Sequence, residues 1–194
     1  MMRPASGQGR CNEQEALVHR LFFALTLDPD TAMNLWRRAE RFSSRHRLAA
    51  RPMRPDRLHI SLNGLGVLKD LDEQFVDLAM KAASRVAAQS FVVALNRLVS
   101  WNGARRPLVL TGDEGVFGVK GLYLEIQAAL SGVGLPSRGA RRFEPHLTLL
   151  RDQVETPPQW LRPPVSWRVQ DFVLIHSRHS LGPHNVLGRW PLLD

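Results

Sequence analysis

Cysteine, tyrosine and lysine are scarce in this sequence, which has one, one and three of them among 194 residues. The single cysteine, Cys11, excludes an internal disulfide and a zinc site built from several thiolates, and it favours a reducing cytosol. No apolar run approaches the roughly 18–20 residues that cross a bilayer, so we expect a cytoplasmic protein that does not enter a membrane. Residues 1–15 also lack the apolar stretch of a secretory signal, and residues 1–18 are predicted to form a disordered leader.

Positive charge is abundant, and almost all of it is arginine. The net charge is +8, and 23 of the 26 basic residues are arginine. The planar guanidinium group fits phosphate oxygens, and a basic surface raises the local concentration of a polyanion such as RNA. A genome that prefers arginine codons would produce the same excess, so composition alone leaves RNA binding open.

Residues 19–194 alternate between strand-like and helix-like patterns. Strands are expected at 20–27, 58–62, 91–99, 108–110, 146–149, 169–176 and 186–192. Amphipathic helices are expected over 32–42, 71–86 and 122–130, and the prolines between 157 and 164 exclude a central strand there. We predict one α+β domain over 19–194 with two pseudo-symmetric lobes, in which antiparallel sheets face a central groove and the helices pack outside.

Two tetrapeptides carry the chemical signal. His59 and Ser61 belong to the sequence HISL, and His146 and Thr148 belong to HLTL, 87 residues further on. Residues two apart in a strand share one face, so each motif sets an imidazole beside a hydroxyl group with apolar side chains behind them. Two such units facing one cleft supply two proton-transfer groups and two hydroxyl donors, enough to open a phosphodiester without a metal.

The flanks of these motifs match a known family. Residues 20–25 (RLFFAL), 58–66 (LHISLNGLG) and 143–151 (FEPHLTLLR) resemble the opening strand and the two His-x-Ser/Thr-x motifs of the two-histidine phosphoesterase superfamily. Within it, the chain resembles the bacterial RNA 2′,3′-cyclic phosphodiesterases, also called 2′-5′ RNA ligases, over roughly residues 18 to 193. It departs from them at Thr111, where the family often has tryptophan, and at His184, near a usual tyrosine.

The resemblance implies metal-independent hydrolysis of RNA 2′,3′-cyclic phosphate ends to 2′-phosphates, with reversible 2′-5′ ligation at the same site. It implies that His59 protonates the 3′ oxygen and His146 activates water, although the two motifs are similar enough to exchange roles. Ser61 and Thr148 are then expected to bind the phosphate. The resemblance adds Arg151, whereas its odd spacing from His146 on a straight strand favours the opposite face.

Other candidates are weaker. Trp101, near a hairpin tip, and Arg141 and Arg142, in a basic loop, are candidate RNA contacts. His176 and His179 have no carboxylate pair nearby, so we expect solvent-facing histidines and no metal site.

Alternative functions remain open at this point. The same site would suit a phosphodiesterase acting on 2′-5′ oligonucleotides or small cyclic nucleotides, and a non-catalytic module would hold RNA ends without turnover. The expected protein is a monomer that needs no cofactor, whose partner is RNA with a 2′,3′-cyclic phosphate or a related nucleotide.

Overall fold

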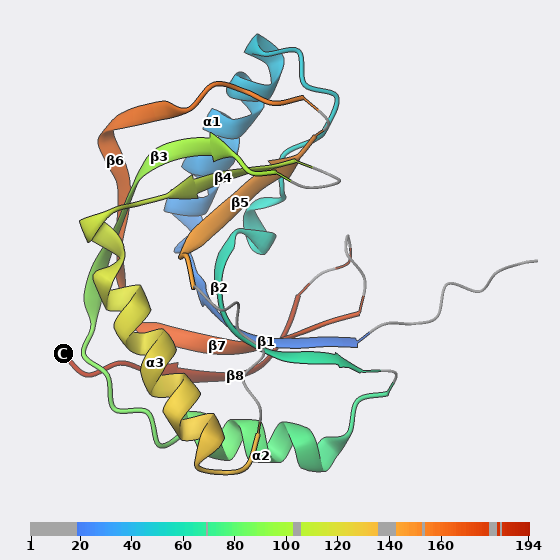
Figure 1. Ribbon diagram of the computed structural model, residues 1–194, viewed down its shortest axis with the longest axis vertical. Helices are drawn as coiled ribbons and strands as arrows, with labels where there is room; N and C mark the ends of the chain where they lie inside the picture. The colour runs from blue at the N-terminus through green and yellow to red at the C-terminus, as the bar shows by residue number, and fades with distance from the viewer. Residues whose placement is uncertain are drawn as a thin grey trace, which may run out of the picture.

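The strands of this protein form one twisted antiparallel sheet. The structure is a computed structural model that describes residues 19–68, 70–102, 106–135, 143–152, 154–178, 182 and 184–194. Eight strands follow the order β6-β3-β4-β5-β2-β1-β7-β8 (Figure 1). The strands are β1 (His19–Thr26), β2 (His59–Leu68), β3 (Phe91–Ser100), β4 (Pro107–Thr111), β5 (His146–Arg151), β6 (Gln159–Val169), β7 (Asp171–Ser177) and β8 (Asn185–Pro191).

Helices connect these strands. They are α1 (Pro29–Arg45), α2 (Glu73–Ala83) and α3 (Phe117–Ser131), with short 3₁₀ turns η1 (Pro55–Arg57) and η2 (Glu114–Val116). Asp28 caps α1 by accepting a hydrogen bond from the Thr31 backbone N–H at 2.8 Å, and Pro29 occupies its first turn. No helix within the described ranges is long and apolar enough to cross a membrane. The predicted α+β class is confirmed.

The sheet has two halves that meet at one pair of residues. One half contains β6, β3, β4 and β5, the other contains β2, β1, β7 and β8, and Ile60 of β2 pairs with Leu147 of β5 where they join. Figure 1 shows β3, β4 and β5 at the top, away from β1, β7 and β8 below. The two lobes predicted from the motif repeat correspond to these halves, which hydrogen bonds join into a single sheet.

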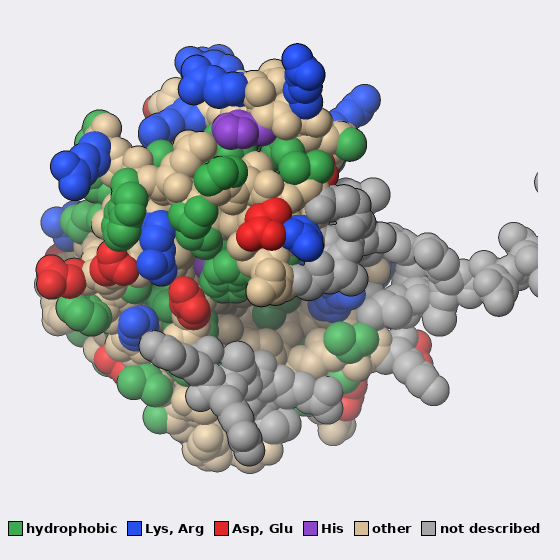
Figure 2. Space-filling view, turned by 45° about the horizontal axis from the view of Figure 1, so that its top comes forward, with side chains coloured by type: hydrophobic (Ala, Val, Ile, Leu, Met, Phe, Trp, Pro, Cys, Tyr) green, Lys and Arg blue, Asp and Glu red, His purple; other side chains and the backbone are tan. Residues whose placement is uncertain are grey.

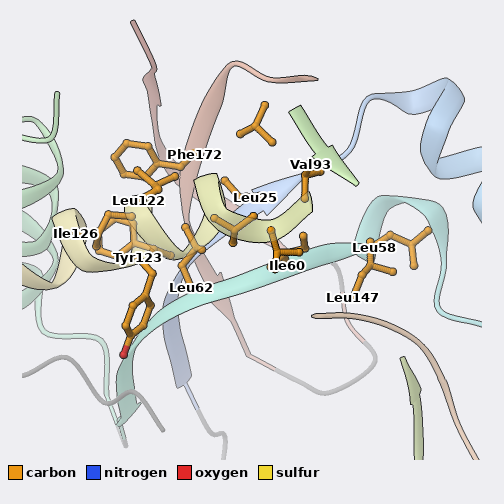
Figure 3. Close-up of a cluster of buried hydrophobic side chains, with 14 of the residues drawn as sticks. Leu25, Leu58, Ile60, Leu62, Val93, Leu122, Tyr123, Ile126, Leu147 and Phe172 are labelled. Atoms are coloured by element: carbon orange, nitrogen blue, oxygen red, sulfur yellow. The ribbon is translucent and has the colours of Figure 1, made fainter. Parts of the chain in front are cut away.

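The core lies behind the two histidine motifs, as strand alternation predicts. Leu58, Ile60 and Leu62 are buried, and Leu147 and Leu149 are buried in the same cluster. In Figure 3, Ile60 and Leu62 extend from the same side of β2, where Leu62 lies near Tyr123 and Ile60 lies near Leu25. Burial of these apolar side chains fixes the opposite face of each strand toward solvent, which is the face of the histidines.

The structure extends one expected strand and adds a strand in the proline-rich connection. Residues 63–66 were expected to end the first motif strand, but β2 continues to Leu68 because β1 pairs with it along its whole length. The proline-rich connection contains an edge strand, β6, with Pro163 and Pro164 inside it. The edge position agrees with the exclusion of a central strand, since an edge tolerates residues that donate no hydrogen bond.

Candidate active site

A pocket of about 930 Å³ lies at the junction of the two half-sheets. His59 and Ser61 of β2 line it together with His146, Thr148 and Arg151 of β5. The antiparallel register through Ile60 and Leu147 sets His59 opposite Thr148 and Ser61 opposite His146 on the other face. The structure therefore brings the four motif residues into one cavity in a local two-fold arrangement, together with Arg151, which the family resemblance implied.

The two histidine rings are anchored in the same way. Nδ1 of His59 lies 2.7 Å from the Arg57 carbonyl oxygen, and Nδ1 of His146 lies 2.9 Å from the Glu144 carbonyl oxygen. A carbonyl only accepts, so each Nδ1 carries a proton and donates it. Nε2 of a neutral ring is then left as the basic nitrogen, and at His59 it lies 3.0 Å from the Ser61 hydroxyl, which donates to it.

An aromatic ring packs against each histidine. The centroids of Phe22 and His59 are 5.3 Å apart, and those of Trp101 and His146 are 4.3 Å apart. Burial is the main cause that lowers the pKa of His59 to about 4, and the nearby positive charge of Arg57 contributes in the same direction. Burial likewise lowers the pKa of His146, with Arg151 acting in the same direction. Both rings are therefore neutral at pH 7 in the protein without ligand.

A β-bulge explains how Arg151 reaches the pocket. Val109 of β4 pairs with Thr148, but the preceding residue, Leu108, pairs with Leu150, so β5 has one extra residue there. Leu149 and Leu150 are both buried as a result, and the alternation shifts by one. Arg151 therefore shares the face of His146 despite the odd spacing, and the straight-strand expectation of the opposite face is wrong.

The first motif contains the matching irregularity. Phe22 of β1 pairs with Gly64 and Ala24 pairs with Ser61, which leaves an extra residue in β2. Leu62 and Asn63 are both buried there, and the Asn63 amide donates to the Tyr123 carbonyl at 3.3 Å. Gly64 thus occupies the position that Arg151 holds in the second motif. The bulges make the backbones alike, while only one motif supplies an arginine.

The pocket also contains residues that the motifs did not indicate. Arg20, Phe22, Arg57, Ser177 and His184 line it. Arg57 is buried, and its Nη2 lies 3.2 Å from Nε2 of His184. Because a guanidinium group only donates, that nitrogen of His184 accepts and its ring is neutral. Burial, with His59 and Arg57 nearby, lowers the pKa of His184 to about 4.

The loop after α1 forms another wall of the pocket. Ala49, Ala50, Arg51 and Met53 line it. Asp152 holds this loop in place, since its carboxylate accepts from the Ala50 backbone N–H at 2.7 Å. Asp152 follows Arg151 directly in the chain, so the end of β5 both lines the pocket and fixes its wall. No sequence pattern predicted these long-range contacts.

The remaining candidates are placed as follows. Trp101 lies against His146 at the end of β3, whereas Arg141 and Arg142 fall outside the described residues. The expectation that His176 faces solvent is wrong, because β7 is covered on both faces and His176 is hydrogen-bonded to His19 at 3.0 Å. His179 falls outside the described residues. Thr111 is buried and donates to the Pro145 carbonyl at 3.2 Å, next to the second motif.

The residues that the structure describes contain no cluster of potential metal ligands. Among the described residues, no group of three or more His, Cys, Asp or Glu side chains could hold a metal ion. The pocket is instead lined by histidine, hydroxyl and arginine side chains, the groups that exchange protons with a phosphate ester and bind its charge.

This fold and site define a member of the 2′-5′ RNA ligase superfamily, whose model matches residues 29–180, and the chain belongs to that superfamily. A relative from Escherichia coli (strain K12), the RNA 2′,3′-cyclic phosphodiesterase, is 32% identical over 190 residues, covering 89% of this chain and 96% of the relative. The crystal structure of E. coli LigT in apo form is similar at a TM-score of 0.71 and 27% identity, covering 92% of this chain and 99% of its own. LigT complexed with 3′-AMP matches at the same TM-score and identity over 91% and 99% of the two chains. The family resemblance noted in the sequence is confirmed.

Proposed function

We propose that this protein opens the 2′,3′-cyclic phosphate at the end of an RNA chain and leaves a 2′-phosphate. The observation that carries the proposal is the pair of identically anchored histidines, His59 and His146, in one pocket with a hydroxyl residue two positions after each. The similarity to an RNA 2′,3′-cyclic phosphodiesterase and to a protein crystallised with 3′-AMP supports the same substrate class.

The proposed reaction needs one base and one acid. Nε2 of His146 takes a proton from water as the water oxygen bonds to phosphorus. The bond from phosphorus to the 3′ oxygen breaks, and Nε2 of His59 gives that oxygen a proton. The product has a free 3′ hydroxyl and a 2′-phosphate. Both Nδ1 atoms are held by carbonyl oxygens, so each ring exchanges protons through the nitrogen left over.

The other pocket residues are assigned to the phosphate. Ser61 and Thr148 donate hydrogen bonds to its nonbridging oxygens. To donate to the phosphate, the Ser61 hydroxyl gives up its hydrogen bond to Nε2 of His59. Arg151 offers a forked pair of donors and a positive charge. The anionic substrate then raises the pKa of His59, because a negative charge near the ring favours its protonated form. In this way substrate binding charges the acid that is neutral in the free protein.

Ligation follows from the same arrangement run with a different nucleophile. If the 5′ hydroxyl of a second RNA replaces water, attack on the cyclic phosphate forms a 2′-5′ linkage. The same two histidines act in ligation and in its reverse, and the acid in one direction is the base in the other. We propose that hydrolysis dominates, because water is the more abundant nucleophile.

The test compares three substrates in the presence of a chelator: an RNA ending in 2′,3′-cyclic phosphate, adenosine 2′,3′-cyclic phosphate, and a 2′-5′ dinucleotide. Turnover of the RNA, with a 2′-phosphate as the product, is the expected result. Preferential cleavage of the dinucleotide would move the assignment to 2′-5′ oligonucleotides. Tight binding of the RNA without turnover of any substrate would make the protein an RNA-end binding module.

A further inference from the structure

The surface of α1 and the loop after it carry an unusual concentration of positive charge. Six arginines between residues 37 and 51 are exposed, and Glu40 is the single acidic residue among residues 31–55. These six, here called the α1 arginine surface, are Arg37, Arg38, Arg41, Arg45, Arg47 and Arg51. Figure 2 shows Lys and Arg side chains gathered at the top of the molecule, where Figure 1 places the C-terminal half of α1.

The arrangement within α1 is unfavourable for the helix itself. Arg37, Arg41 and Arg45 recur every four residues and lie along one side of the helix, where like charges repel one another. None of the six forms an ion pair with another residue of the described ranges. No ion pair among the described residues therefore offsets these charges, and the repulsion between Arg37, Arg41 and Arg45 weakens the helix.

A general excess of arginine does not account for the cluster. The other two helices contain no arginine: α2 carries Glu73, Asp77 and Lys81, and α3 carries Lys120 and Glu125. A bias in codon usage would place arginine on every exposed helix. Its restriction to α1 and the following loop indicates a local role.

The α1 arginine surface ends at the candidate active site. Arg51 lines the pocket, and its loop is tied to the second motif strand by a hydrogen bond of 2.6 Å from the Met53 N–H to the Leu149 carbonyl. The Ser43 hydroxyl donates to the Ala50 carbonyl at 3.2 Å and thereby ties α1 to the same loop. Arginine side chains thus occur both in the pocket, at Arg51 and Arg151, and along the adjoining helix as far as Arg37. The nine residues from Arg37 to Arg45, eight steps of about 1.5 Å, alone extend about 12 Å along the helix, which is longer than a single phosphate group.

We propose that the α1 arginine surface binds the phosphate backbone of the single-stranded RNA whose cyclic end occupies the pocket. The inference rests on the proposed function for the identity of that end. A cyclic mononucleotide fills the pocket but does not reach the helix, whereas a longer RNA gains contacts with both. The surface therefore selects RNA ends over free cyclic nucleotides, and its contribution decreases with salt as bound counterions compete.

The test uses two triple variants of equal charge. R37Q/R41Q/R45Q removes the three arginines along one side of α1, here called the α1 stripe. R85Q/R162Q/R168Q removes three exposed arginines elsewhere. Each triple variant lowers the net charge from +8 to +5. Glutamine has a helix propensity close to that of arginine, and the stripe variant also relieves repulsion, so it should melt no lower than the wild type. None of the six substituted residues lines the pocket.

Two substrates separate the outcomes: adenosine 2′,3′-cyclic phosphate and a 12-nucleotide RNA with a 2′,3′-cyclic end. The stripe variant should turn over the mononucleotide normally and lose roughly tenfold in kcat/KM for the RNA. The slope of log affinity against log salt should fall by about 2, from three lost contacts of about 0.7 each. The control variant should stay close to the wild type in both.

Equal losses in the two variants, or none in either, would overturn the proposal, because the effect would then follow from total charge or be absent. Fluorescence anisotropy of the labelled RNA gives the same comparison without turnover. If the wild type opened no cyclic phosphate yet bound the RNA through the α1 stripe, the proposed catalytic function would be wrong. The proposal that the α1 arginine surface binds RNA would still hold. Equal binding of a duplex RNA would contradict the single-stranded assignment.

Discussion

The Nδ1 atom of His59 lies 2.7 Å from the carbonyl oxygen of Arg57, two residues earlier in the chain. His146 repeats this relationship with Glu144 at 2.9 Å. The backbone itself therefore sets the tautomer of both rings and presents the same nitrogen, Nε2, for proton transfer. Because the acceptor is the backbone carbonyl two residues before each histidine, just ahead of its strand, the geometry needs no carboxylate partner to orient the ring.

Removal of either ring should remove most of the activity. We expect His59→Ala and His146→Ala each to lower the turnover of a cyclic mononucleotide by about 10²–10⁴-fold, the usual range for loss of a general acid or base. Steady-state kinetics with circular dichroism as a check on folding measures this. His46→Ala, on the C-terminal side of α1 and outside the pocket, is the matched control. Full activity in either pocket variant would contradict the proposed roles.

A plot of kcat/KM against pH should be bell-shaped, with its maximum at acid pH. Burial lowers the pKa of His59 to about 4 and lowers that of His146, so the singly protonated free protein is most abundant below pH 6.5. We expect kcat/KM to be greatest there and to fall as the pH rises toward 8, because kcat/KM reports the free protein. The kcat profile should lie at higher pH, since the bound phosphate favours the protonated ring. An optimum of kcat/KM above pH 7.5 would rule out this account.

Arg151 should act on binding more than on the chemical step. Arg151→Gln removes a charged donor to phosphate, and hydrogen bonds to charged groups contribute about 1.5–3 kcal/mol, so KM should rise roughly tenfold or more. Its positive charge also lowers the pKa of both histidines, after the larger effect of burial, so both limbs of the pH profile should move upward in the variant. Arg106→Gln, whose partner is Glu155, is a control outside the pocket. Unchanged KM in Arg151→Gln would show that the side chain does not bind phosphate.

Local patterns in the sequence were sufficient to predict the two motif strands and the pairing of each histidine with a hydroxyl residue. Alternation of apolar and polar residues decides which face of a strand is buried, and that is a local property. The position of Arg151 was not predictable in this way. It depends on a bulge, which arises from how β4 and β5 pair and has no signature within HLTLLR.

The contacts that cross the chain could not be predicted either. Arg57 and His184 are 127 residues apart, and nothing near either residue indicates the other. His176 was misassigned for a similar reason: its polar neighbours Ser177 and Arg178 resemble a surface segment, but β1 and β8 enclose β7 on both edges. Pairing between distant strands, more than local composition, decides which histidines are buried.

Buried histidines should make the protein less stable in acid. Burial lowers the pKa of His59 and His184 to about 4 and lowers that of His176, whereas in the unfolded chain these groups titrate near 6.5. Between pH 6.5 and 4 the unfolded chain therefore binds more protons, so the free energy of unfolding decreases as the pH falls through this window.

Thermal unfolding monitored by circular dichroism from pH 7.5 to pH 4 measures this effect. The melting temperature should be nearly constant above pH 6.5 and decrease below it. His176→Gln keeps a donor and an acceptor toward His19 without a titrating ring, so its melting temperature should depend less steeply on pH. A melting temperature that rises on acidification would disprove the assignment of neutral buried rings.

The pair formed by Arg57 and His184 should control the acidity of His59. The His184 ring packs edge-on against His59 with centroids 4.9 Å apart, and Arg57 holds it there by donating to Nε2 at 3.2 Å. Removal of this ring in His184→Ala should admit water to His59 and weaken the burial that lowers its pKa. We expect the acidic limb of kcat/KM to move upward by about one pH unit. His184→Gln, whose side-chain carbonyl can still accept from Arg57, should stay closer to the wild type in the same pH series. If the alanine and wild-type profiles coincided while KM for a cyclic mononucleotide changed, His184 would contact the substrate and would not position His59.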